Sequence, residues 1–385
     1  MHICFVGEGI HPPWTRGHQT VSRELISCLG AKAEVSLITT KMGQGCKYSS
    51  QSSEFTKQLK KLIEVKGSGN FYLDSFRLSK AFSKFAKENK VDVVHLTGIN
   101  VGIFALWHRL SKPPDLIIIR HYYMPLPEKS VLNTLMKPLL YLIYSRLIDG
   151  ITVTSPLVKE WLSKRIQPER VSLISLPVDC EFFKPLENNK FRNDEGQHTM
   201  LYLGSISRKR FPLSVLQALS ILKGKGVNIL LLVIGRYDSE YSENWLKKIR
   251  ETISNLDLKK NIKVELKALN EEEKLSLYNS VDMVIFPYEE HIEVTDPPIT
   301  LLEAMSCGRV VLASKIQSIP HLISHGTNGF LLDSLKAEEI AEKIELGLNS
   351  SWNELSSNAR NIIRKHFSRG KVAGDLFNFY QGFLN

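Results

Sequence analysis

Arg208, Lys209 and Arg210 form a run of three cations shortly after Gly204. The apolar run Met200 to Leu203, which this glycine ends, is typical of a buried strand, so we expect the cations to lie at a strand's carboxyl end. The guanidinium fork of arginine binds two phosphate oxygens together, and lysine adds a point charge. The run therefore suits a diphosphate, and the alternative is a basic turn that faces solvent.

The segment from Thr295 to Glu303 combines a helix start with a carboxylate. Pro298 favours the first helical position, and Thr295 or Asp296 is the expected N-cap just before it. The unbonded N–H groups and the positive dipole end of such a helix attract an anion. Glu303 lies further along the same helix, where its carboxylate would bind hydroxyls. The alternatives are pure capping for Asp296 and an ordinary surface carboxylate for Glu303.

Three further positions stand at or after the ends of apolar runs. His121 follows Arg120 at the end of a predicted strand, where its ring would bind a phosphate or hydroxyl or serve the structure alone. Gly17 lies in the loop after the first predicted strand and would let the backbone approach a ligand or only form the turn. Gly235 ends the run before it. The sequence contains no GxxxxGK[ST] phosphate loop, no GxGxxG fingerprint, no HExxH and no GxSxG.

These residues stand in an alternation of apolar runs and helical patterns that favours parallel sheets covered on both faces. The predicted strands of the first half are residues 2–7, 34–39, 91–96, 116–120, 150–154 and 171–176. Those of the second half are residues 200–203, 229–234, 262–266, 283–286 and 310–313. We therefore predict an α/β fold with two doubly wound domains, residues 1–180 and 199–365, joined by a polar linker at 181–198. Ligands of such sheets bind beyond the carboxyl ends of the strands, so the expected site is the cleft between the domains.

Composition excludes several classes of protein. The 385 residues are 43% hydrophobic and 23% charged, which is ordinary globular usage and excludes disordered and fibrous chains. No apolar run reaches the roughly 18 residues that span a bilayer, and the first residues do not resemble a secretory signal. Five scattered cysteines without a CxxC pair indicate neither a metal site nor a disulfide framework, and they favour a reducing cytosol.

The formal net charge of +10 falls in the first half of the chain. Residues 1–190 hold 26 basic and 16 acidic side chains, whereas residues 191–385 hold 24 of each. Such a positive field attracts a phosphorylated substrate, an anionic membrane surface or nucleic acid. The basic and apolar stretch Lys129 to Arg146 is a candidate for shallow membrane contact, with an ordinary packing helix as the alternative. Nucleic acid is not expected, because no recognisable binding motif is present.

Several motifs, taken in order, resemble glycosyltransferase family 4, the retaining nucleotide-sugar transferases with the GT-B fold. The strongest match is residues 298–314, PITLLEAMSCGRVVLAS, against a family pattern like LLEAMACGxPVVAS. Further matches are residues 277–287, 328–331 and 177–185. The resemblance covers nearly the whole chain. It implies two Rossmann-like domains, with a last helix, about residues 366–385, that packs back on the first domain.

The resemblance also implies roles for individual residues. Glu303 would bind the nucleotide ribose, and His121 would contact the transferred sugar. The other expected donor-binding residues are Gly17, Arg208, Lys209, Arg210, Gly235, Thr295, Asp296, Thr300, Leu301 and Leu302, of which the last three would offer backbone amides to the diphosphate. The expected catalytic residues are His121, Asp296, Arg208 and Lys209. This sequence departs from the family pattern at two positions. Thr295 stands where the family has the first Glu of its E-x7-E signature, and Ser205 stands where the family has Arg.

The implied reaction moves a sugar from a nucleoside diphosphate sugar to an acceptor, with retention and without a metal or other cofactor. The acceptor is expected to be a glycan, lipid-linked or phosphorylated, because the first half is basic. The expected location is cytoplasmic, with a peripheral position on the cytoplasmic membrane face left open. Replacing Glu303 by alanine is expected to abolish transfer and leave the fold intact. The alternative, for which Thr295 and Ser205 speak, is a degenerate transferase fold that binds a sugar nucleotide or polyanion without turnover.

Overall fold

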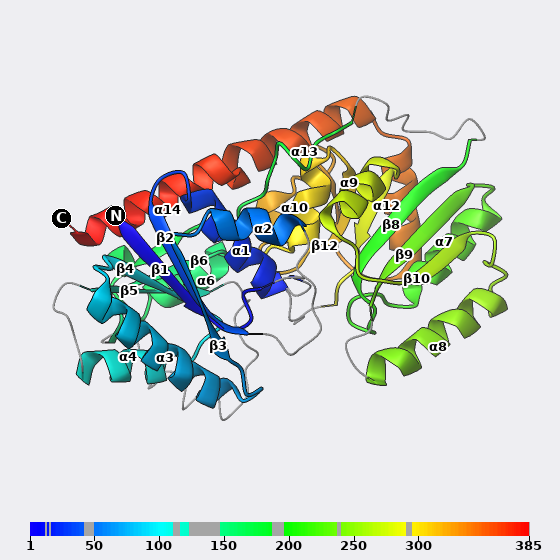
Figure 1. Cartoon of the computed structure of the whole chain (residues 1–385). Coiled ribbons are helices and arrows are strands. Elements are labelled where there is room, and N and C mark those ends of the chain that lie inside the picture. Colours follow the sequence, from blue (N-terminus) through cyan, green and yellow to red (C-terminus); the bar gives the residue numbers. More distant parts are fainter. Residues whose placement is uncertain are drawn as a thin grey trace. The chain divides into compact units, whose positions relative to one another are not determined.

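The computed structural model consists of two compact units (Figure 1). The first is Met1–Pro177 with Arg369–Asn385, and the second is Val178–Ser368. The structure describes residues 1–11, 14, 17–41, 50–110, 116–122, 147–186, 196–236, 240–289 and 295–384. Each unit is an α/β fold built on a parallel sheet, as the sequence predicted. The stretch Lys129 to Arg146 lies outside the described residues.

The first unit is built on a seven-stranded sheet in the order β3-β2-β1-β4-β5-β6-β7, with every neighbouring pair parallel. Its strands are β1 (His2–Gly7), β2 (Glu34–Lys41), β3 (Lys61–Lys66), β4 (Val93–Thr97), β5 (Ile117–Tyr122), β6 (Gly150–Val153) and β7 (Val171–Leu173). The order reverses between β1 and β4, which makes that pair of strand ends the switch point of a doubly wound sheet.

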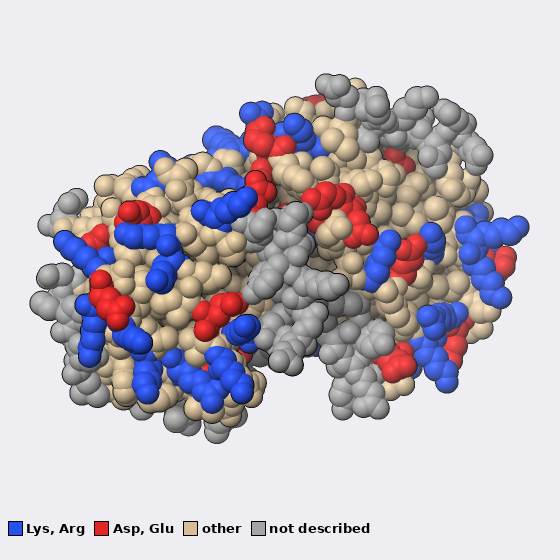
Figure 2. Space-filling model, viewed as in Figure 1, with Lys and Arg blue, Asp and Glu red and all other residues tan. Residues whose placement is uncertain are grey.

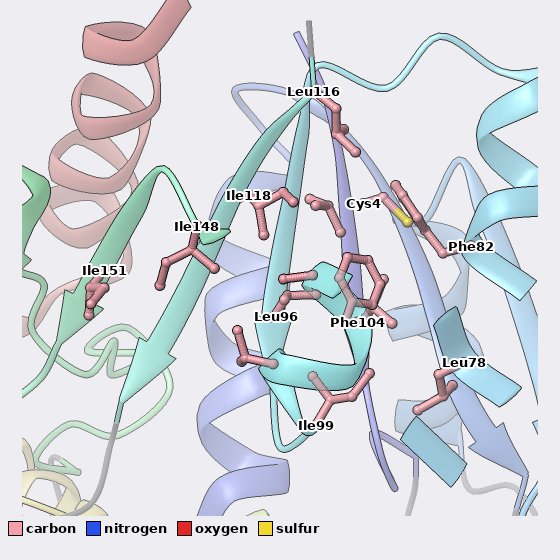
Figure 3. Packing of buried hydrophobic residues seen from close by; sticks show 14 of the residues in the cluster. Cys4, Leu78, Phe82, Leu96, Ile99, Phe104, Leu116, Ile118, Ile148 and Ile151 are labelled. Carbon is pink, nitrogen blue, oxygen red and sulfur yellow. The ribbon is translucent and has the colours of Figure 1, made fainter. Parts of the chain in front are cut away.

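One face of this sheet is covered by α3 (Phe71–Glu88), α4 (Val101–Leu110) and α6 (Pro156–Ser163). Figure 3 shows how Phe82 of α3 and Phe104 of α4 pack with Cys4, Leu96 and Ile118 of the sheet. Because side chains alternate along a strand, Phe5 and His95 point to the opposite face. The core cluster therefore fixes which residues of β1 and β4 remain for the other face.

The other face is covered by α1 (Gly17–Leu29) and α14 (Arg369–Leu384), which pack on each other. Tyr380 of α14 hydrogen-bonds Nδ1 of His95, whose ring stacks on Phe5 with centroids 4.7 Å apart. The buried Glu24 carboxylate of α1 accepts hydrogen bonds from Arg369 at 2.8 Å and pairs with its neighbour Arg23. A helix from the far end of the chain thus completes the first unit. The remaining described helices of this unit are α2 (Ser50–Lys57) and the short turn η1 (Pro168–Arg170).

The second unit has a six-stranded parallel sheet in the order β10-β9-β8-β11-β12-β13. Its strands are β8 (His198–Ser205), β9 (Ile229–Arg236), β10 (Ile262–Leu266), β11 (Met283–Phe286), β12 (Val310–Ser314) and β13 (Phe330–Leu332). Its helices are α7 (Ser214–Gly224), α8 (Glu240–Asn255), α9 (Glu271–Asn279), α10 (Ile299–Ser306), α11 (Ile319–Leu322), α12 (Ala337–Leu348) and α13 (Trp352–Phe367). The order reverses between β8 and β11, which is the switch point of this sheet.

The segment predicted as the start of a linker is packed within the second unit. Val178 forms an isolated bridge with Ser368, and Phe183 is buried. Arg360 of α13 donates hydrogen bonds to the carbonyls of Cys180 at 3.1 Å and Phe183 at 3.2 Å. The described residues 178–186 therefore belong structurally to the second unit, and 187–195 of the predicted linker lie outside the description.

Within the residues the structure describes, no helix is long and apolar enough to cross a bilayer. The same residues contain no cluster of three or more His, Cys, Asp or Glu side chains arranged to hold a metal ion.

Candidate functional site

The switch point of the second unit gathers most of the residues that the sequence singled out. The carboxyl ends of β8, β9 and β11 lie at one edge of the sheet, and α10 begins shortly after β11. Parallel sheets bind their ligands at this edge because the strand order leaves a crevice there. His121 and Gly17 belong to the first unit.

The basic run Arg208 to Arg210 forms a turn directly after β8. Its backbone is tied to the segment after β11, because the Glu289 N–H donates to the carbonyl of Lys209 at 2.8 Å. The Arg208 side chain is 78% exposed and lies 3.9 Å from the Glu289 carboxylate. An exposed pair at that distance contributes little free energy, so the guanidinium keeps the freedom to meet a ligand.

Arg210, Tyr288 and Thr300 come together where the basic turn meets the start of α10. Burial raises the pKa of Tyr288 to about 12, while the charge of Arg210 and a hydrogen bond with the Thr300 side chain oppose the rise. The Tyr288 hydroxyl is therefore neutral at physiological pH. A cation and two hydroxyls at one helix start are the groups that bind phosphate oxygens.

The backbone amides in the first turn of α10 fall into two pairs. The N–H groups of Leu301 and Leu302 donate to the carbonyl of Pro298, at 3.1 and 3.3 Å. These two amides, which the resemblance offered to a diphosphate, are thus engaged within the helix. The amides of Ile299 and Thr300 precede the first helical hydrogen bond, so they carry the positive end of the helix dipole.

The predicted capping of this helix is wrong. The N-cap of α10 is Pro298, and no side chain caps it. The buried carboxylate of Asp296 instead accepts a hydrogen bond from Ser318 N at 3.0 Å and a second from the Ser318 hydroxyl. Thr295 is buried beside it. Asp296 therefore anchors the connection between β12 and α11, which sequence spacing did not suggest.

Glu303 lies in α10 three residues after Thr300, so both side chains share one side of the helix. Its carboxylate is 4% exposed and accepts from Lys274 Nζ at 2.8 Å and from the Tyr278 hydroxyl at 2.9 Å. Burial raises the pKa of Glu303 above its ordinary value, and the charge of Lys274 opposes this. Glu303 is thus an internal carboxylate, where the alternative sequence interpretation had a surface one.

The far end of α10 is fixed by a glycine. Gly308 has φ 68°, and the amides of Gly308 and Arg309 donate to Met305 and Ala304. This pair of bonds is the Schellman motif, which ends a helix at a left-handed residue. Arg360 adds a hydrogen bond of 2.6 Å to the Ser306 carbonyl. The helix that carries Glu303 is therefore held at its end by backbone geometry and by a guanidinium.

Gly235, predicted as a donor-binding residue, has a clear structural reason. A Cβ atom built on Gly235 would lie 1.8 Å from the carbonyl oxygen of Gly204, its partner on β8. Only glycine allows β8 and β9 to pair at this edge. The close approach accounts for the glycine whether or not a ligand passes over it.

In the first unit, His121 lies on β5 and is 3% exposed. Its Nδ1 is 2.8 Å from the Thr152 hydroxyl oxygen on β6, and its ring centroid is 5.6 Å from that of His95. Burial lowers the pKa of His121 to about 3, so the ring is neutral at physiological pH. Gly17 is the first residue of α1, at the end of the connection from β1.

Sequence reasoning missed the residues that surround the predicted ones. Lys274 and Tyr278 stand four residues apart on α9 and so share one face, but their partner Glu303 is more than twenty residues away in the chain. Tyr288 lies just beyond the end of β11, and this position is the one signal that could have drawn attention to it. Ser318 had no such signal.

Two family models match the chain in succession. "Glycosyltransferase Family 4" matches residues 15–182, and "Glycosyl transferases group 1" matches residues 183–366. A D-inositol 3-phosphate glycosyltransferase of Pseudarthrobacter chlorophenolicus is 24% identical over 184 residues, which is 46% of this chain and 41% of that protein. The capsular polysaccharide biosynthesis glycosyltransferase CapM of Staphylococcus aureus is 28% identical over 208 residues, which is 52% of this chain and 51% of CapM. The matches thus span about half the length of these curated relatives.

Two solved structures resemble this chain over nearly its whole length. A glycosyltransferase from Rickettsia africae superposes with a TM-score of 0.79 at 18% identity, covering 100% of this chain and 98% of its own. Anabaena HepE in complex with UDP gives 0.75 at 15% identity, covering 99% and 100%. At these identities the likeness establishes the fold. With the two family models, it confirms the resemblance seen in the sequence: the chain belongs to the group 1 and family 4 glycosyltransferases.

Proposed function

We propose that the protein transfers a sugar from a nucleoside diphosphate sugar to a glycan acceptor. The observation that carries the proposal is the arrangement at the switch point of the second unit. There Arg210, Tyr288, Thr300 and the first amides of α10 converge, with Glu303 on the same side of that helix. A diphosphate needs cations and N–H donors, and a ribose needs an acceptor such as a carboxylate. The structural relative HepE binds UDP, which supports a UDP-sugar as the first donor to test.

In this proposal the second unit stabilises the leaving group. The diphosphate gains negative charge as the glycosidic bond breaks, and donors already in place lower the free energy of that state. Arg208, Lys209 and Arg210 would supply charge, and the amides of Ile299 and Thr300 would supply N–H groups.

Glu303 would hold the ribose while keeping its internal partners. A carboxylate offers about four lone-pair positions, and Lys274 and Tyr278 occupy two of them. The remaining positions would accept the ribose hydroxyls. The charge of Lys274 opposes the pKa rise that burial causes and so favours the ionised form of the carboxylate. Lys274 and Tyr278 are therefore positioning residues in this proposal.

The remaining parts of the reaction are also proposals. The neutral ring of His121 would hydrogen-bond the transferred sugar, and Asp296 would take part only if it could leave Ser318. Retention of configuration and independence of metal are family expectations. The relatives' names support a glycan acceptor, and a Debaryomyces hansenii relative is a chitobiosyldiphosphodolichol mannosyltransferase, which favours a lipid-linked one. A cytoplasmic site of action belongs to the same proposal.

A thermal-shift screen against UDP, GDP, ADP and their sugar conjugates tests the donor site. A ligand that binds only the folded state raises the melting temperature, by an amount that grows with its concentration over Kd. We expect one nucleotide to shift the protein clearly above the others, and the Arg210→Gln variant to lose most of that shift. Arg364→Gln, on α13, is the matched control. No shift with any nucleotide would refute the assignment of the site, and a shift without transfer to any acceptor would refute the reaction.

A further inference from the structure

Four large hydrophobic side chains are exposed together in the first turns of α3. Phe71 is 43% exposed, Tyr72 63%, Leu73 44% and Phe76 39%. We call these four residues the α3 patch. Single exposed hydrophobic residues are normal on protein surfaces, but a contiguous group marks a surface that meets something apolar. Leu106 of α4, the helix that packs on α3, is a further exposed residue at 58%.

The α3 patch is held in place by its own backbone contacts. The Asn70 side chain caps α3 by accepting from the N–H groups of Tyr72 and Leu73, both at 3.1 Å. The buried Asp74 carboxylate accepts from the N–H groups of Ser68 at 2.8 Å and Gly69 at 3.1 Å, which fixes the turn before the helix. The aromatic rings therefore project from a rigid helix start, so docking would cost little ordering of the backbone.

Cations continue the exposed side of α3 beyond the patch. Arg77, Lys80, Lys84 and Lys87 follow Leu73 at spacings of three and four, which places them on one helical stripe. The acids of α3 are the buried Asp74, which lies 3.7 Å from the Arg77 guanidinium, and Glu88 near the end. The Arg77 guanidinium also donates to the Lys66 carbonyl at 3.0 Å, so among the described cations of α3 the three lysines are left for a ligand. Figure 2 shows Lys and Arg side chains gathered over the part of the first unit where Figure 1 draws α3 and β3.

We propose that α3 docks the protein on an anionic lipid bilayer. The aromatic rings of the patch would enter the interface at the level of the headgroups, and Lys80, Lys84 and Lys87 would meet lipid phosphates. Interfacial helices have this composition, with aromatic and apolar residues on the buried side and basic residues beside them. This inference rests on the proposed function in one respect: docking on a bilayer would bring the protein to a lipid-linked acceptor.

The charge on the stripe favours a bilayer over a protein. Interfaces between proteins are depleted of lysine, whereas anionic lipid attracts each lysine by a factor of about five in affinity. Two copies of this chain packed through the α3 patch would bring their lysines toward each other. The whole excess of positive charge also lies in residues 1–190, which include α3.

Co-sedimentation of the intact protein with vesicles tests the inference. Vesicles of phosphatidylcholine alone are compared with vesicles of phosphatidylcholine mixed with phosphatidylglycerol. We expect binding to the mixed vesicles, a drop of roughly 30-fold in the Lys80→Gln, Lys84→Gln double variant, and a drop of about tenfold in the Phe71→Ser, Tyr72→Ser double variant. Matched controls in the second unit are Lys259→Gln with Lys260→Gln, and Leu346→Ser, whose side chain is 45% exposed.

Three results would overturn the proposal. One is equal binding to both vesicle types, another is loss of binding in the control variants as large as in the α3 variants, and the third is no vesicle binding at all. Light scattering adds a separate check. If the protein is a dimer and the Phe71→Ser, Tyr72→Ser variant is a monomer, the patch is instead the interface with a second copy of this chain. Nucleotide-induced thermal shifts should be unchanged in every α3 variant. Failure of nucleotide binding with intact vesicle binding would therefore refute the donor site and leave the docking surface standing.

Discussion

Replacing Glu303 by alanine should destabilise the second unit, in contrast to the expectation from sequence that the fold would stay intact. The carboxylate is 4% exposed and is the acceptor for both Lys274 and Tyr278. Alanine would leave a largely buried ammonium and a fully buried hydroxyl without that acceptor. Loss of activity in this variant would then report unfolding as much as a missing contact to the donor.

The size of the effect follows from burial. Removing one member of a buried ion pair costs about 3–5 kcal/mol, and an unsatisfied buried hydroxyl costs about 1–3 kcal/mol. Lys274 keeps 18% exposure and can turn toward water, so we expect the lower end, about 3 kcal/mol. That is a large part of the roughly 5–15 kcal/mol that holds a typical domain together.

Urea unfolding of a double-mutant cycle measures this cost. The cycle comprises Glu303→Ala, Lys274→Met and the double variant, and we expect the double variant to be more stable than the sum of the single effects by about 2 kcal/mol, because methionine removes the stranded charge. Glu345 provides the matched control. It pairs with Lys225 at 2.6 Å, but the two side chains are 37% and 50% exposed, so Glu345→Ala should cost under about 1 kcal/mol.

The reasoning fails if Glu303→Ala unfolds at the same urea concentration as Glu345→Ala, or if the cycle shows no coupling between Glu303 and Lys274. Glu303→Gln is the variant to use for activity, because its amide oxygen still accepts a hydrogen bond. With a folded protein in hand, nucleotide-induced thermal shifts then measure the carboxylate's contribution to donor binding directly.

Three further predictions concern pH, strand pairing and the packing of residues 178–186. The folded-state pKa of His121 lies at about 3, below its unfolded value, so the free energy of unfolding should fall as the pH drops from about 6 toward 4. Urea unfolding at each pH measures this dependence, and it should be shallower in the His121→Gln variant. Gly235→Ala should cost about 3 kcal/mol or more in thermal unfolding, because the added Cβ would clash with the Gly204 carbonyl oxygen of the neighbouring strand. The control Gly374→Ala should be neutral or stabilising, because Gly374 lies in a helix and an added Cβ would have no atom within 4 Å. Arg360→Met should destabilise by about 2–3 kcal/mol, because the carbonyls of Cys180 and Ser306 lose the guanidinium donor and that of Phe183 keeps only the Ser306 hydroxyl. Equal melting of Arg364→Met and Arg360→Met would refute this.

Most of the fold could be predicted because buried parallel strands are continuous apolar runs. The five strands predicted for the second half are all present in the structure, with shifts of a few residues at their ends. β3 was missed because Lys61, Glu64 and Lys66 interrupt its apolar residues. β3 is the edge strand of its sheet, where one side of the strand faces solvent and tolerates charged residues. β13 was missed because three residues are too short for a pattern.

The candidate site was only partly predictable because its geometry depends on contacts between distant segments. The sequence placed Glu303 on a helix that begins near Pro298, and this is confirmed. Nothing local indicated that the carboxylate would be buried against α9. Asp296 stands in a sequence pattern typical of an N-cap, yet its partner is Ser318, in the connection between β12 and α11. Local propensity therefore located the elements, and tertiary packing decided what each side chain binds.

The return of the chain to its first unit has a consequence during synthesis. The first unit needs α14, which supplies Arg369 to Glu24 and Tyr380 to His95, but α14 is translated only after the whole of Val178–Ser368. Until then, of the described helices, α1 alone covers that face of the nascent first unit's sheet, and the surface that α14 buries stays exposed, while the second unit can already fold. The inserted unit should therefore be the first to mature, and the host unit should be the part that chaperones hold during translation.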